Sequence, residues 1–98
     1  MPEVSINQSE EILLLIERNR WIGHEEYSNF KTIKRDSHLP KNELISRLIF
    51  LQEKDWIIYS EEGRGHYALT LFGKDKALAL LDRLHSELKF GPAQKTDI

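Results

Sequence analysis

Four histidines are the side chains of this sequence best suited to bind a metal ion, because the chain contains no cysteine. Zinc ligands commonly come in pairs about three to five residues apart, so that one helix or turn presents both. The histidines are His24, His38, His66 and His85, and no two of them have this spacing. The sequence therefore predicts no metal site and no cofactor, and each histidine is expected at the surface or in a structural role.

Adjacent carboxylates occur at Glu25-Glu26 and at Glu61-Glu62. Neighbouring side chains on a helix or strand point in different directions, whereas a catalytic acid and base face one substrate. Gly63-Arg64-Gly65 lies between two β-prone runs and lacks the third glycine and the following helix that dinucleotide binding needs. We therefore predict that the chain is not an enzyme.

The composition is that of a small protein with a packed core: 98 residues, 40% hydrophobic and 31% charged. We expect one domain over residues 1–90 and a flexible tail over 91–98. The longest apolar run, Ile12 to Ile16, is too short to span a membrane, and residues 1–20 do not resemble a signal peptide. A cytoplasmic location is therefore expected. The net charge of −2 argues against a protein that coats nucleic acid, but it is compatible with a local basic face.

Three helices are predicted before residue 55. The first helix is predicted to begin near residue 6 or 8, because Ser5 with Gln8 and Asn7 with Glu10 both have the spacing of a capping box. It is predicted to end at Trp21-Ile22-Gly23. Its apolar residues cover more than one side of the helix; they are Ile6, Ile12, Leu13, Leu14, Leu15 and Ile16.

The second predicted helix is Glu25 to Lys34, where Tyr27, Phe30 and Ile33 recur at three-residue spacing. The third begins with Pro40, which suits a first helical position, and runs to about Lys54. Its inward stripe is Leu44, Leu48 and Leu51.

A hairpin and a long helix are predicted after the turn at Asp55. The β-prone runs Trp56 to Tyr59 and His66 to Leu69 flank a glycine-containing connection. Thr70 is placed to cap a helix that continues to about Lys89, before the break at Phe90-Gly91-Pro92.

The last predicted helix has an apolar seam. Ala77, Leu81, Leu84 and Leu88 recur at spacings of four, three and four residues, which suits helix pairing. Leu78 and Leu80 add apolar surface that one small domain is not expected to cover. The seam is therefore predicted to lie partly in the core and to form the contact of a homodimer.

Two short motifs lie between residues 48 and 73. Leu51, Gln52, Glu53, Lys54, Asp55, Trp56 and Ile57 match a helix end written Leu-Glu-Glu-Lys-Gly-Leu-Ile, and Tyr67, Leu69, Thr70 and Gly73 match Tyr-x-Leu-Thr-x-x-Gly. In these motifs the chain resembles winged helix-turn-helix transcriptional regulators of the MarR, ArsR and PadR kind. The resemblance implies an α+β, mostly α fold, with three helices, a two-stranded wing and a long C-terminal helix.

The resemblance also implies a regulator that binds double-stranded DNA, with residues 40–54 in the major groove and residues 57–69 as the wing. Asn reads adenine, Glu accepts from cytosine and Ser is permissive, so base contacts are expected from Asn42, Glu43 and Ser46, flanked by Lys41 and Arg47. Phosphate contacts are expected from Lys31, Lys34, Arg35 and His38. Arg64 is expected to reach the minor groove.

Three features depart from the family pattern. Asp55 replaces a glycine, Ile49 and Phe50 stand where polar or basic residues are common, and the wing holds Glu61 and Glu62 beside Arg64. Phe50 lies opposite the inward stripe, so it either packs locally or contacts a partner together with the seam of the last helix. The alternative function is therefore a protein-protein interaction module, or an accessory or inhibitor protein without DNA binding.

Overall fold

The first helix begins at the second of its two possible caps. In the computed structural model, which describes residues 6–89, α1 runs from Gln8 to Trp21. Asn7 Oδ1 accepts from the Glu10 N–H at 2.8 Å, and the Asn7 N–H donates to Glu10 Oε1 at 3.2 Å. This capping box confirms the predicted start near residue 8. Ser5, the other predicted cap, lies outside the described residues.

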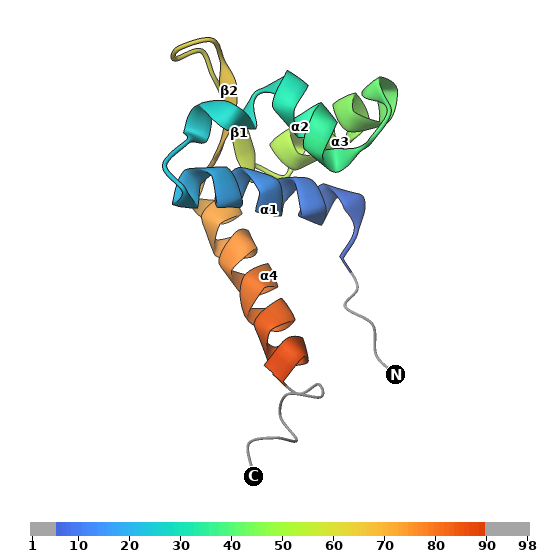
Figure 1. Ribbon diagram of the computed structural model, residues 1–98, viewed down its shortest axis with the longest axis vertical. Helices are drawn as coiled ribbons and strands as arrows, with labels where there is room; N and C mark the ends of the chain where they lie inside the picture. Colours follow the sequence, from blue (N-terminus) through green and yellow to red (C-terminus); the bar gives the residue numbers. More distant parts are fainter. Residues whose placement is uncertain (1–5, 90–98) are drawn as a thin grey trace.

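The second helical segment is interrupted, so the predicted single helix over Glu25–Lys34 is wrong. Glu25–Ser28 forms one 3₁₀ turn, η1, and α2 runs from Phe30 to Ser37 (Figure 1). Asn29 between them accepts from the Thr32 N–H at 2.9 Å and donates to a carbonyl of η1 at 2.8 Å. Because an Asn side chain competes with the helical backbone for such bonds, Asn29 ends one segment and caps the next.

Helix α3 runs from Lys41 to Glu53, within one residue of its predicted limits. Pro40 is the N-cap rather than the first helical residue. The predicted inward stripe of α3 is confirmed, because Leu44, Leu48 and Leu51 are buried. Asp55 then has φ 60°, the left-handed conformation that Asp adopts more readily than most residues.

The two strands form one antiparallel sheet. β1 is Ile57–Ser60, one residue later than predicted, and β2 is His66–Leu69, as predicted. Ile57 pairs with Leu69 and both are buried, while Ile58 and Tyr59 are exposed. The sheet therefore joins the core at its base, and its tip projects from the molecule (Figure 1).

Helix α1 is the centre of the fold. In Figure 1 it crosses the middle of the molecule, with α2, α3 and the hairpin on one side and α4, Leu71–Lys89, on the other. The core contains buried residues from every helix and both strands; its members on α1 are Ile12, Leu13 and Ile16. The prediction that the first helix is covered on more than one side is thus confirmed. The described part of the predicted domain shares a single hydrophobic core.

Helix α4 buries part of the predicted seam. Ala77 is fully buried, so the prediction that it contacts a second subunit is wrong; Leu80 is also buried, at 2% exposure, whereas Leu81 is 39% exposed. The prediction that Leu80 adds uncovered surface is therefore wrong, because the chain rotates Leu80, not Leu81, toward α1. The side chain of Leu88 and the predicted stop and tail over residues 90–98 lie outside what the structure describes. No helix within residues 6–89 is long and apolar enough to cross a membrane.

Candidate nucleic-acid interface

A corner of four residues fixes the hairpin between α3 and α4. We call Asp55, Trp56, Thr70 and Gly73 the corner. Thr70 Oγ1 donates to the Asp55 carbonyl and accepts from the Gly73 N–H at 2.9 Å, and the Thr70 N–H donates to the Trp56 carbonyl at 3.0 Å. A Cβ on Gly73 would come within 1.8 Å of the Trp56 carbonyl oxygen, so only glycine permits this contact. The predicted capping role of Thr70 is confirmed.

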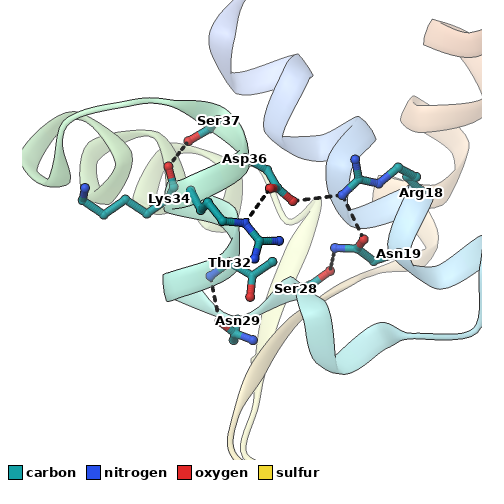
Figure 2. A network of polar contacts seen from close by, with 9 residues as sticks. Arg18, Asn19, Ser28, Asn29, Thr32, Lys34, Asp36 and Ser37 are labelled. Atoms are coloured by element: carbon teal, nitrogen blue, oxygen red, sulfur yellow. Dashed lines mark hydrogen bonds and ion pairs between the residues drawn. The ribbon is translucent and has the colours of Figure 1, made fainter.

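A polar network holds η1 and α2 against α1 (Figure 2). Asn19 is buried and donates through Nδ2 to Ser28 Oγ at 3.1 Å, and it accepts from Arg18 Nη2 at 3.2 Å. Arg18 Nη2 and Arg35 Nε each lie 3.0 Å from a carboxylate oxygen of Asp36. These contacts position α2 by directional bonds rather than by apolar packing alone.

The two arginines favour the charged form of the Asp36 carboxylate. Its pKa is lowered, first by the hydrogen bond from Arg35 and then by that from Arg18, against the opposing effect of burial. Asp36 thus links α2 to α1 through its ion pair with Arg18. The sequence analysis did not predict roles for Asn19, Ser28 and Asp36. The position of Asn19, three residues after Ile16 on an apolar helix, was a signal for a buried polar contact.

A three-residue turn sets the angle between α2 and α3. His38 has φ 60° and ends α2, and the Leu39 N–H donates to Ser37 Oγ at 3.4 Å. Leu39 is buried, so the turn is anchored in the core, and Pro40 leads directly into α3. His38 is exposed at this turn, which is its predicted surface position.

The predicted DNA-contacting cations divide into two groups. Lys31, Lys34, Lys41 and Arg64 are exposed, and none of them forms an ion pair within residues 6–89. Arg35, by contrast, is paired with Asp36.

Arg47 also has partners inside the molecule. Its Nη2 lies 3.1 Å from Gln8 Oε1 and 3.7 Å from Glu43 Oε1. Arg47 and Glu43 therefore join α3 to the start of α1 and neutralise one another, which makes them poorer candidates for contact with a nucleic acid than sequence reasoning implied.

The outward face of α3 is formed by Asn42, Ile45, Ser46 and Ile49, which we call the α3 face. At about 100° per residue these four side chains fall within an arc of about 100°. All four are exposed, with Ile45 at 38% and Ile49 at 49%. Asn42 and Ser46 form no side-chain hydrogen bond inside the described part of the chain. The face is thus polar at its N-terminal end and mixed with aliphatic side chains further along.

Two adjoining clefts separate α3 and α2 from the hairpin. The smaller, about 490 Å³, is apolar and is lined by Phe30, Ile45, Ile49, Gln52, Tyr59 and Tyr67. The larger, about 1120 Å³, lies between η1, the start of α2 and the hairpin; its charged lining residues are Glu25, Glu26, Lys31, Glu62 and Arg64. Phe30 and Tyr59 line both clefts, so the two clefts form one continuous surface of mixed charge.

The hairpin side of these clefts is shaped by two tyrosines. The Tyr59 and Tyr67 rings meet edge to face with centroids 5.2 Å apart. Burial raises the pKa of the Tyr67 hydroxyl, and the neighbouring Tyr59 raises it further. Tyr59 lies over Gly65, where an added Cβ would meet its hydroxyl at 1.9 Å.

Phe50 is partly covered by its own neighbours. It remains 41% exposed, but its ring meets Trp56 edge to face at 6.3 Å, and Lys54 Nζ lies 5.5 Å from its centroid. Lys76 of α4 lies over the other ring, 5.2 Å from the Trp56 centroid. Phe50 thus belongs to a cluster at the end of α3 and not to the α3 face.

The histidines do not gather into a ligand set. Within residues 6–89 no group of three His, Asp or Glu side chains is arranged to hold a metal ion. His24 Nδ1 lies 3.0 Å from Glu26 Oε2, and its ring stacks on Tyr27 at 4.7 Å. The contact with His24 lowers the pKa of the Glu26 carboxyl.

Comparison with known proteins adds no relative: no protein-family model matches the sequence, and no curated protein is significantly similar to it.

Proposed function

We propose that the chain is a winged helix-turn-helix domain that binds double-stranded DNA as a transcriptional regulator, with α3 as the recognition helix and the β1–β2 hairpin as the wing. The observation that carries the proposal is a set of exposed cations without an acidic partner within residues 6–89. These are Lys31 and Lys34 on α2, Lys41 at the start of α3, and Arg64 at the hairpin tip. They come from the elements that neighbour a recognition helix in a winged helix and would supply its phosphate contacts.

The proposed contacts follow from this arrangement. Asn42 and Ser46 read base edges from the first turns of α3, where recognition helices approach the bases most closely. Lys31, Lys34 and Lys41 bind phosphates, and Arg64 enters the neighbouring minor groove.

The other predicted contacts take supporting roles in this proposal. Arg35, Glu43 and Arg47 orient α2 and α3 through their ion pairs instead of contacting DNA. His38 holds the turn between the two helices in its left-handed conformation. The MarR, ArsR and PadR likeness supports the same assignment through the corner motif.

A homodimer would present two copies of α3 to half-sites about 34 Å apart. The surface available for it on α4 is Leu71, Leu78 and Leu81, which are exposed by 78%, 52% and 39% and lie on one side of the helix. Sedimentation at micromolar concentration should show a species of twice 11.5 kDa. Leu78→Glu should convert it to the monomer, and a wild-type chain that sediments only as a monomer would contradict the dimer.

The apolar cleft favours a second candidate, a winged-helix protein-interaction module. Ile45 and Ile49 on α3 and the tyrosines of the hairpin offer apolar surface, and Glu61 and Glu62 place negative charge at the tip. Charged residues are depleted at the centre of protein interfaces and aromatic residues enriched, as in this cleft. An accessory or inhibitor protein without DNA binding would use the same surface.

Salt-dependent binding to random duplex DNA separates the two candidates. Each phosphate contact contributes about −0.9 to the slope of log K against log salt, so Lys31→Gln with Lys34→Gln should flatten the slope by about 1.8. Lys74→Gln, on α4 away from the α3 face, is the matched control and should leave the slope unchanged. Absence of duplex binding at about 50 mM salt would reject DNA binding in favour of the protein-interaction module.

A further inference from the structure

The α3 face is poor in groups that recognise guanine. Guanine is read in the major groove chiefly by arginine or lysine, which donate to its O6 and N7 atoms. The arginine on α3, Arg47, donates to Gln8 Oε1 at 3.1 Å and pairs with Glu43. Lys41 lies about 100° around the helix from Asn42, outside the arc of the α3 face.

The groups that remain on the face are those that recognise A·T pairs. Asn42 is exposed near the N-terminus of α3 and is free to donate to adenine N7 and accept from its N6 amino group. Ile45 and Ile49 are exposed at three and seven residues beyond it. In the major groove the C5 methyl of thymine is the one apolar group that a base presents, and an exposed aliphatic side chain is its complement.

We propose that the α3 face selects A·T base pairs, with Asn42 hydrogen-bonded to adenine and Ile45 and Ile49 packed on thymine methyl groups. The inference rests on the proposed DNA-binding function and deepens it by naming the class of site. It also accounts for two exposed isoleucines on a helix that is otherwise flanked by unpaired lysines. The cations at Lys31, Lys34 and Lys41 suit a polyanion whose contact surface includes methyl groups, and this charge complementarity favours DNA over an apolar protein surface.

Replacement of thymine by uracil tests the contact directly, because uracil keeps the base pair and lacks only the methyl group. Duplexes selected from a randomised pool at low salt should be enriched in A·T pairs. Within the best duplex, single thymine-to-uracil replacements should weaken binding roughly fourfold at each contacted position, which is the effect of leaving one CH₂-sized group unburied. Asn42→Ala should reduce the preference for adenine roughly tenfold.

Variants of the face identify which isoleucine meets which methyl. Ile45→Ala and Ile49→Ala should each abolish the thymine-over-uracil preference at one position, whereas Ile49→Val should retain it. Ile22→Ala is the matched control, because Ile22 is 56% exposed after the end of α1 and outside the α3 face. It should leave every thymine-to-uracil ratio unchanged. Thermal unfolding of each variant confirms that it is folded.

The outcomes distinguish the inference from the function on which it rests. Binding to duplex DNA with no difference between thymine and uracil, or selection of G·C-rich sites, would overturn A·T selection and leave DNA binding standing. Failure to bind any duplex at low salt would overturn both and identify the α3 face and its cleft as a protein-docking surface.

Discussion

The corner and the α3 face are the two most informative regions of this molecule, and they differ in whether their residues have partners inside the chain. Each corner residue has a partner inside the chain: Thr70 bonds to Asp55, Trp56 and Gly73, and Gly73 packs on the Trp56 carbonyl. On the α3 face Asn42 and Ser46 have no such bond within residues 6–89, and Ile45 and Ile49 remain exposed. Folding therefore requires the hydroxyl of Thr70 and the absence of a side chain at Gly73, whereas the side chains of the α3 face are left for another molecule to use.

The strongest way to break this comparison is at the corner. Gly73→Ala should cost about 3 kcal/mol of unfolding free energy, because the added Cβ overlaps backbone that is held by the Thr70 N–H. Urea denaturation measures this cost. Gly63→Ala is the control: it has no atom within 4 Å of an added Cβ but has φ +62°, so it should cost only about 1 kcal/mol. Equal costs at the two glycines would refute the steric role of Gly73.

The next largest effect is expected in the buried polar network. Asn19→Ala should cost about 2 kcal/mol, because it leaves the buried Ser28 hydroxyl without its donor. The same change at the exposed Ser46, Ser46→Ala, should alter stability by less than about 0.5 kcal/mol. If Asn19→Ala with Ser28→Ala costs the full sum of the single changes, the two side chains are not coupled and their hydrogen bond does not position η1 on α1.

Acid should weaken the same network by a smaller amount. Asp36 has a folded-state pKa below its ordinary value of 3.8, so its contribution is present above that pH and is lost as pH falls through the folded pKa. Asp36→Asn should lower stability by less than about 1 kcal/mol at neutral pH, and the difference should vanish in acid. Chemical denaturation as a function of pH measures it. A difference that persists to the lowest pH would show that Asp36 acts through packing instead of charge.

A modest stability effect is expected on the α3 face. Ile45→Ser with Ile49→Ser should lower the unfolding free energy by about 1–2 kcal/mol, less than Gly73→Ala alone, because the two side chains are only partly buried, with 38% and 49% of their surface exposed. The same double variant should weaken binding to the selected duplex more than tenfold, given about fourfold for each methyl contact. A large loss of stability would place the two isoleucines in the core and remove the contrast with the corner.

Local signals were sufficient for most of the elements. The Asn7–Glu10 spacing, the Leu44–Leu48–Leu51 stripe, the glycine hairpin and the Thr70 cap act over a few residues each, so the sequence predicted them correctly. The break at Asn29 was missed because Glu25–Lys34 has helical periodicity throughout, and a single side chain overrides it. Leu80 was predicted to add uncovered surface because Leu80 and Leu81 are adjacent leucines, and only packing against α1 selects which of them is buried.

The sequence alone determined the order of the elements, their caps and the residue types at the corner, because those depend on neighbours within about one turn or one strand pair. Tertiary structure decided where the longer-range polar contacts form. Arg35–Asp36 and Glu43–Arg47 join residues one and four positions apart and are local pairs, whereas Arg18 reaches Asp36 across 18 positions. Lys31, Lys34, Lys41 and Arg64 have no ion pair within residues 6–89. Arg47 meets Gln8 across 39 positions of sequence, and no local pattern encodes a contact at that separation.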